Sequence, residues 1–243
     1  MFAIFKKELQ SFFYTPFAYS IAALFMLIFT YMFNGGIADI DSSTFYFSFT
    51  DIFYNVTLFF IFLIPIMTMR TFSDERKFGT EVLLMTSPNG VFKIVIGKFL
   101  ANIVVFLFML FCSLLFPLVA HLNGEVVVSQ LLCAYLGFFC WGAMCIAVGM
   151  LMSSFTENSI IAAILGEVAM LIIVFIDDFS RTAFVSQYPK LQSVLYAFSA
   201  QPKFAYFSQS LIRLSDIVFF ISAIVVFIAW TIISIEKRRW NRG

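Results

Sequence analysis

Long apolar runs separated by short polar connections are the dominant pattern of this chain. They predict membrane-spanning helices, because a helix needs about 20 mostly apolar residues to cross the hydrocarbon of a bilayer. We expect six spans, at Phe17–Phe33, Val56–Met69, Val91–Leu122, Ser129–Met152, Ser159–Ile176 and Ile217–Ile235. The second run is short, so its helix is expected to begin earlier, and Pro65 predicts a kink in it. The fold class is therefore an all-α membrane protein, with residues 1–243 as a single transmembrane domain.

A dense cluster of charged residues lies between the second and third runs. The stretch from Thr68 to Pro88 reads TMRTFSDERKFGTEVLLMTSP. Its charged residues are Arg70, Asp74, Glu75, Arg76, Lys77 and Glu81. Because so many charges are too costly in hydrocarbon, we predict that residues 70–90 form a water-facing connection between two spans.

The second half of this connection has the order of a short helix. Gly79 and Thr80 predict a turn and an N-cap, and Glu81 suits a first helical turn. An apolar stretch that includes Leu83 follows, and Pro88 ends it. We therefore expect a short amphipathic helix at the membrane face, where a partner outside the membrane docks.

The first 15 residues are too polar to span a membrane. Large apolar side chains recur there at helical spacing, at Phe2, Phe5, Leu9, Phe12 and Phe13. Lys6, Lys7 and Glu8 lie off this face. The pattern predicts an interfacial helix in the plane of the membrane.

The connection at 177–216 also has helical periodicity. Leu191, Leu195 and Phe198 precede a break at Gln201-Pro202, and Phe204 and Phe207 follow it. We expect an external helical hairpin that lies against the outer leaflet or dips into it.

Composition narrows the function. The chain is 62% hydrophobic and 12% charged, far from the averages of soluble domains, so its expected environment is a lipid bilayer. The net charge of +1 gives no basis for binding nucleic acid. The 35 phenylalanines predict apolar bulk that faces lipid. Four cysteines fit no metal-binding spacing, and no cofactor is expected.

Basic residues are unequally divided between the two sides of the predicted bundle. Eleven lie on the side of the termini and the charged cluster, and four lie in 177–216. The positive-inside rule then places both termini and residues 70–90 in the cytoplasm.

Few residues suggest chemistry within the membrane. His121 is expected to pack at an interface, and no Walker A motif occurs in the sequence. Glu167 is the exception, because a carboxylate within a span is costly. It either faces a polar pathway or subunit interface, or it is a protonated group bonded to a neighbouring helix. Asp177 and Asp178 are expected at the outer interface.

Four stretches of the sequence together cover most of the chain. They are FKKELQSFFYTPFAY, the charged cluster followed by IVIGKFLA, AVGMLMSSFTENSIIAAIL, and DIVFFISA with EKRRW near the C-terminus. In these stretches the chain resembles the ABC-2 type permease family, and most closely its six-span branch associated with gliding motility and nitrous-oxide reductase maturation.

The resemblance implies a permease of the bacterial cell (inner) membrane, usually an exporter. Two such subunits, the same or related, pair with two cytoplasmic ATP-binding-cassette ATPase subunits. The N-terminal helix and residues 70–90 are implied to form the docking surface for the ATPases. The residues implied in coupling are Glu75, Arg76, Gly79, Thr80, Glu81 and Leu83. Catalysis of ATP hydrolysis is expected on the partner, not on this chain.

Two other classes of protein remain open at this point. An ion-coupled secondary transporter would use Glu167, although such proteins need charges in relay and usually contain internal repeats. A membrane-embedded enzyme would need clustered histidines or carboxylates. Co-purification of a P-loop ATPase distinguishes the permease from both.

Overall fold

The computed structural model describes residues 1–38, 49–81, 90–123, 127–182, 188–208 and 211–241. In these ranges the chain is helical apart from turns and short connections, and it contains no strand. Six helical stretches are long and apolar enough to cross a membrane. They are Phe17–Gly35, Ile52–Lys77, Val91–Leu122, Val128–Phe155, Ser159–Ser180 and Leu214–Arg238. The predicted all-helical, multi-pass architecture is therefore confirmed.

The first two spans are α2 (Phe17–Ala38) and α3 (Phe49–Thr68), and the short helix α4 (Arg70–Lys77) follows α3. The third predicted span consists of two helices, α6 (Val91–Ser113) and α7 (Leu115–Asn123). Pro117 explains the break, because its ring displaces the carbonyl four residues earlier, at Ser113. The last three spans are α8 (Val128–Phe155), α9 (Ser159–Ser180) and α13 (Leu214–Asn241).

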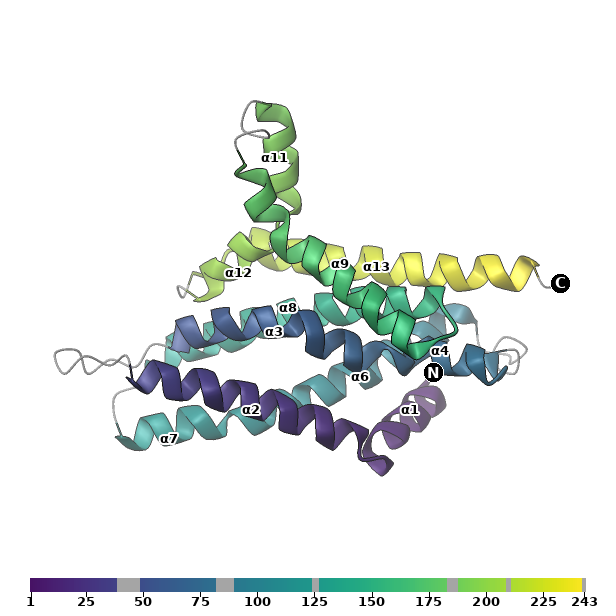
Figure 1. The fold of residues 1–243 in the computed structure, drawn as a ribbon, viewed down its shortest axis with the longest axis horizontal. Helices are drawn as coiled ribbons and strands as arrows, with labels where there is room; N and C mark the ends of the chain where they lie inside the picture. The colour runs from purple at the N-terminus through teal and green to yellow at the C-terminus, as the bar shows by residue number, and fades with distance from the viewer. Residues whose placement is uncertain (39–48, 82–89, 124–126, 183–187, 209–210, 242–243) are drawn as a thin grey trace.

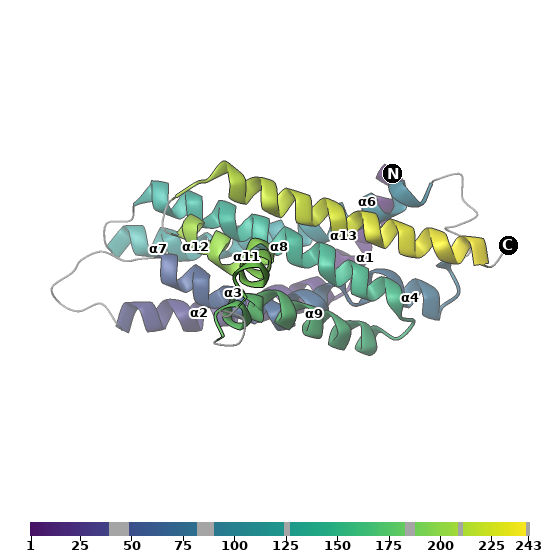
Figure 2. The same ribbon diagram turned by 90° about the horizontal axis from the view of Figure 1, so that it is seen from above.

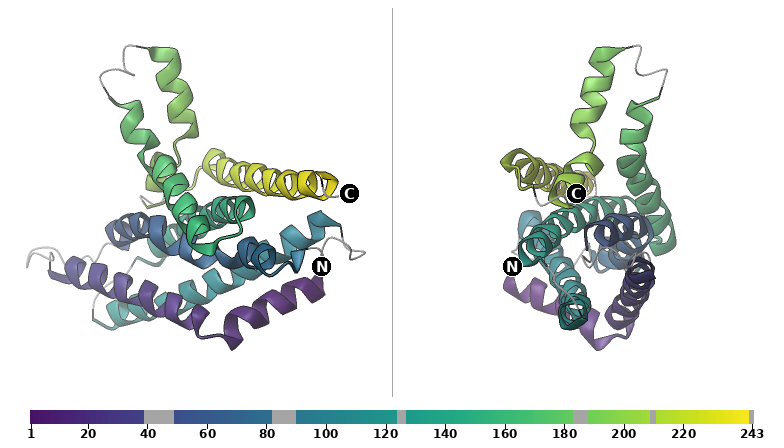
Figure 3. Two further views of the ribbon diagram at one scale, coloured as in Figure 1. Left: turned by 45° about the vertical axis from the view of Figure 1, so that its right-hand side comes forward. Right: turned by 90° about the vertical axis from the view of Figure 1, so that its left-hand side faces the viewer.

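Most of the long helices run lengthwise in one bundle (Figure 1). Both termini and α4 lie at the same end of it, and the view from above in Figure 2 agrees. Helix α8 is the centre, since it packs against α3, α4, α6, α9 and α13. α9 crosses the bundle obliquely and leads to α11 (Pro189–Phe198), which stands away from the other helices (Figure 3).

Small residues let the other helices approach α8 closely. A Cβ atom added to Gly142 would overlap the ring of Phe106 on α6, and one added to Gly149 would overlap Thr68 on α3. Ala143 and Ala147 on the same helix are buried. Because lipid provides no hydrophobic drive between helices, this close packing is the main source of their attraction.

Phenylalanine fills much of the interior, which corrects the expectation that these side chains mainly face lipid. Phe138 on α8 lies within ring-contact distance of Phe25, Phe53, Phe60 and Phe106. All five side chains are 0–1% exposed. Other phenylalanines, such as Phe111 at 71%, are exposed on the outside of the bundle. Phenylalanine therefore occurs both in the core of the bundle and on its outer surface.

The predicted two helices within 177–216 are present as α11 and α12 (Gln201–Ser208). α12 packs on α8 and α3, and its Phe204 and Phe207 are 1% and 0% exposed. Asp177 belongs to α9, is 6% exposed, and pairs with Arg181 at 2.8 Å, while its place at the outer interface stays a prediction.

The N-terminal helix α1 (Phe2–Tyr14) packs along α6 and touches α2. Ile4 lies over Gly97, and the Phe13 ring meets that of Phe108 edge-on with 5.5 Å between centroids. The two contacts are more than two turns apart on each helix, so α1 is held along its length.

The close approach of α9 to α3 can be tested by a substitution at Gly166. A Cβ on this residue would lie 2.9 Å from Cβ of Pro65. We expect Gly166→Leu to destabilise the protein by about 1–3 kcal/mol through overpacking. Gly35→Leu is the control, because no atom lies within 4 Å of its added Cβ. Thermal unfolding in detergent measures both, and equal melting temperatures would contradict this packing.

Candidate functional site

The four stretches that carry the family resemblance meet at the end of the bundle that holds both termini. Glu8 comes from the first stretch and Glu75 and Lys98 come from the second, and these three are joined by ion pairs. Ser153 from the third and Arg238 from the fourth contact the same region. Segments far apart in the sequence thus form one polar assembly around α4.

Helix α4 lacks a cap of its own, and a serine from α8 supplies one. The residue at its N-cap position, Met69, has no side-chain group that can accept hydrogen bonds. Oγ of Ser153 accepts from the backbone N–H groups of Phe72 at 3.1 Å and Ser73 at 3.3 Å. The same hydroxyl donates to the carbonyl of Met69 at 2.8 Å. It therefore satisfies groups that a helix start leaves unpaired.

The beginning of α9 adds a second attachment. Oγ of Ser159 donates to Oδ1 of Asp74 at 2.6 Å and lies 3.2 Å from Oγ of Ser73. Because Ser159 is the first residue of α9, the end of α8 and the beginning of α9 both bind α4. The charged segment is thereby fixed to two spans.

Arg76 is engaged within the chain. Its guanidinium bonds Oε1 of Glu157 at 2.9 Å and the carbonyl of Ser154 at 3.3 Å, and its Nε lies 3.8 Å from Glu81. Glu81 is also 3.9 Å from Nη1 of Arg238, and Nη2 of the same arginine donates to the carbonyl of Ser154. The C-terminal helix α13 is thus joined to the same assembly.

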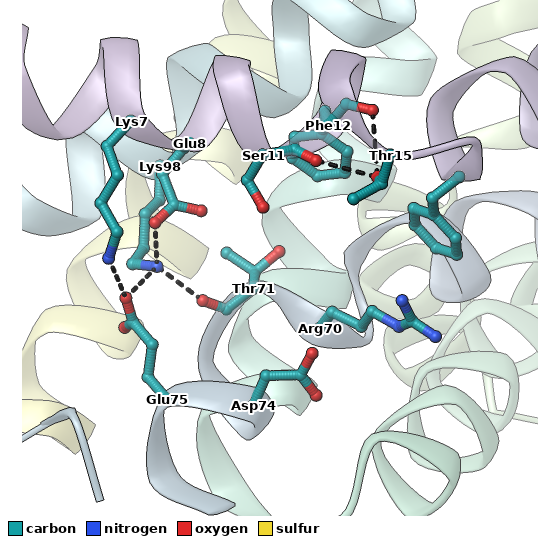
Figure 4. Close-up of a pocket in the computed structure, with 11 residues that line it drawn as sticks. Lys7, Glu8, Ser11, Phe12, Thr15, Arg70, Thr71, Asp74, Glu75 and Lys98 are labelled. Carbon is teal, nitrogen blue, oxygen red and sulfur yellow. Dashed lines mark hydrogen bonds and ion pairs between the residues drawn. The ribbon is translucent and has the colours of Figure 1, made fainter. Parts of the chain in front are cut away.

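Lys98 is the most deeply buried charge of the site, with 1% of its side chain exposed. Its ammonium lies 2.9 Å from Glu8 on α1 and 2.9 Å from Glu75 on α4, and it donates to the carbonyl of Thr71 at 2.8 Å (Figure 4). Lys7 approaches Glu75 at 3.7 Å. Two cations and two carboxylates therefore balance one another, as burial of charge requires.

A cavity of about 190 Å³ lies beside this network and is lined by α1, α4 and Lys98. Arg70 borders it and places its guanidinium 4.7 Å from the ring centre of Phe17 (Figure 4). Ser11 and Thr15 line the same space. The cavity is open and its lining is partly polar, so water can reach the edge of the network, whereas the Lys98 side chain is 1% exposed.

The exposed part of the site is the turn that follows α4. Gly79 has a φ of 70°, a left-handed conformation that favours glycine, and it ends α4. Lys77, Phe78, Gly79 and Thr80 are exposed, with Phe78 at 72%. Helix resumes at Glu81, whereas Leu83 and the predicted amphipathic helix lie outside the described residues. We call Lys77–Thr80 the tip.

The structure thus divides the residues implied in coupling. Glu75, Arg76 and Glu81 face other parts of this chain, with side chains 12–13% exposed. Gly79 and Thr80 belong to the exposed tip. The sequence reading missed Lys98 and Ser153, although a lysine within the apolar stretch IVIGKFLA was a signal that it needs buried partners.

Glu167 lies away from this assembly, near the middle of α9. It is partly exposed and sits between the buried residues Ala163 and Met170 and the exposed residues Ile164 and Leu171. It makes no hydrogen bond or ion pair with another described residue. Glu167 thus lies at the border between the packed and the exposed sides of α9.

Neither protein-family models nor curated proteins match this chain.

The cross-chain cap can be tested at Ser153. We expect Ser153→Ala to destabilise the protein by about 1–3 kcal/mol, because buried backbone groups of α4 lose their partner. Ser222→Ala is the matched control, since that exposed hydroxyl bonds only the carbonyl of Phe219 in its own helix. Unfolding in detergent measures both variants. A loss at Ser153 no larger than at Ser222 would refute the cap.

Proposed function

We propose that this chain is the membrane-spanning permease subunit of an ATP-binding-cassette transporter, and that it acts as an exporter. In this proposal α4 and the tip are the coupling element, and ATP is hydrolysed by separate cytoplasmic ATPase subunits. The observation that carries the proposal is the attachment of α4 to α1, α6, α8 and α9 by polar contacts, with Arg238 of α13 near Glu81 just beyond the end of α4.

The attachment supports coupling for a mechanical reason. A connection that only links two spans needs no ordered contacts with other helices. A segment that is pushed from outside must pass its displacement to the spans, and a rigid, multiply attached helix does so. The tip is exposed while the residues behind it are held, which is the arrangement that such a segment needs.

The tip and its surroundings suit a partner with an apolar groove and acidic edges. Phe78 and Phe92 are 72% and 59% exposed, and Lys6, Lys77 and Lys93 are exposed at the same end. Burial of the aromatic rings would provide most of the affinity, because exposed ion pairs contribute little. Arg76, already paired with Glu157, is not needed for this contact.

The grouping of basic residues supports a cytoplasmic location for this end. Lys6, Lys77, Lys93 and Lys237 all lie near the termini and the tip, which are together in Figure 1. In this proposal α1 lies at the inner face of the membrane. α11 and the beginning of α12 form the external hairpin on the outer side. The chain would then be a multi-pass protein of the bacterial inner membrane.

This orientation predicts which side of the membrane is labelled. In a background without the native cysteines, Ser193→Cys on α11 should react with an impermeant thiol reagent applied outside intact cells. Thr80→Cys at the tip should react only after the membrane is permeabilised. Both positions are exposed in the structure, so a difference in labelling reports the side of the membrane and not burial within the protein. The opposite pattern would invert the topology.

The proposal also includes a second permease subunit, the same or related. α9 and α13 present exposed apolar side chains over much of their length, including Ile164, Ile172, Val225 and Trp230. Glu167 lies at the edge of the α9 face. A neighbouring subunit that covers this face would give the carboxylate a polar partner that lipid does not offer.

The secondary-transporter alternative rests on Glu167 alone. A proton or ion relay needs further ionisable groups at successive depths. Glu167 has no such neighbour among its described contacts, and the charged groups of the site gather at the end of the bundle instead. The permease proposal therefore has the broader support.

Co-purification from native membranes tests the proposal. We expect a P-loop ATPase to be isolated with the wild-type chain and to hydrolyse ATP in the complex. Lys77→Glu combined with Phe78→Ala should reduce the recovered ATPase by about tenfold, because truncating a buried aromatic anchor costs 1 kcal/mol or more. Lys237→Glu, also exposed at this end, is the control. Recovery of the chain without any ATPase would reject the proposal.

A further inference from the structure

The helices at the cytoplasmic end fall into two packing groups. α1 packs on α6 and α2, whereas α4 packs on α8, α9 and α3. Lys98 belongs to α6 but reaches across to both groups. It binds Glu8 on α1 and Glu75 and the Thr71 carbonyl on α4.

Further contacts of α6 with α4 surround the same residue. Nδ2 of Asn102, one turn after Lys98, lies 3.4 Å from Oγ1 of Thr71 and donates to the Lys98 carbonyl at 2.9 Å. The Lys98 ammonium also lies 5.3 Å from the ring centre of Phe72. Asn102 and Lys98 on α6 thus both contact α4 here.

We infer that Lys98 is a positioning residue that joins α1 to α4, so that the N-terminal helix moves with the tip. The inference deepens the proposed function and rests on it for its consequence in transport. The joint itself is a property of this chain alone. Through this joint α1 becomes part of the coupling element, even though most of its packing contacts are with α6.

Burial makes this joint stiff. Because the Lys98 side chain is 1% exposed, water cannot readily replace a carboxylate partner, so separating α1 from α4 would take one of two carboxylates from a buried ammonium. Lys7 and Glu75 form a second, weaker link, since the Lys7 side chain is 64% exposed and its Nζ is 3.7 Å away. The two links provide a test residue whose side chain is 15% exposed, Glu8, and a control that is 64% exposed, Lys7, on the same helix.

The test compares Glu8→Gln with Lys7→Gln. Glu8→Gln removes the charge that Lys98 holds on α1 but keeps the size of the side chain and leaves the pair of Lys98 with Glu75. Spin labels at Lys6→Cys and Lys77→Cys, both exposed positions, report the distance between α1 and the tip in the full chain in lipid nanodiscs. A cysteine-free background is used, and no partner protein is needed.

We expect a narrow distance distribution for the otherwise unchanged chain and for Lys7→Gln, and a broader one for Glu8→Gln. A distribution of unchanged width in Glu8→Gln would overturn the joint, because apolar packing alone would then hold α1. Equal broadening in the two variants would also overturn it, by assigning the link to the exposed pair. Lys98→Met removes all contacts of the ammonium and should broaden the distribution further. The comparison of Glu8→Gln with Lys7→Gln decides the joint even if Lys98→Met does not fold.

A second measurement tests the consequence for transport. In complexes with the ATPase, Glu8→Gln should retain the bound partner and lose about fivefold in substrate moved per ATP hydrolysed, within the range for mutations that alter coupling. Lys7→Gln should retain it. Unchanged coupling in Glu8→Gln would overturn the role in transport. If no ATPase is recovered, the proposed function fails, whereas the distance measurement still decides the joint.

Discussion

A charged side chain that is buried at the end of a membrane helix needs a partner within the protein. This constraint organises the structure around α4. The helix follows α3 without an intervening loop and carries several charged residues. Ser153 caps its backbone, Lys98 neutralises Glu75, and Glu157 pairs with Arg76. Ser153 lies on α8, Lys98 lies on α6, and Glu157 lies in the link between α8 and α9. Together with Lys7 of α1 and Ser159 of α9, these contacts bring four other helices to one short segment.

The packing of the spans serves the same arrangement. α8 lies at the centre because glycines and alanines on its surface admit α3 and α6 closely, and phenylalanine rings fill the wider spaces between helices. Ser153 follows Gly149 by one turn on this helix. The close approach of α8 to Thr68 at Gly149 therefore sets the distance at which Ser153 reaches the beginning of α4. Helix packing and the polar assembly depend on each other.

The two ends of the bundle differ in the contacts that hold their helices together. This difference agrees with a protein that receives force at one end. At the end with the termini, ion pairs and serine hydroxyls hold the helices together. Towards the other end, α12 inserts Phe204 and Phe207 among the spans, and α11 packs against the end of α9, away from the rest of the bundle (Figure 3). Helices α9 and α13 keep exposed apolar faces between these ends. The proposed permease uses the first end for coupling and the exposed faces for a second subunit.

The sequence by itself determined the six apolar helices, the two amphipathic helices in 177–216 and the turn at Gly79, because these follow from local composition, periodicity and backbone preference. It did not determine that Asp177 and Lys98 are buried, or that phenylalanines fill the core. Those outcomes depend on which residues of distant helices face one another, and no local pattern encodes that. Lys98 was read from the sequence as one more basic residue near the cytoplasm. Only the tertiary structure placed Glu8 and Glu75, from segments far away in the chain, at 2.9 Å from its ammonium.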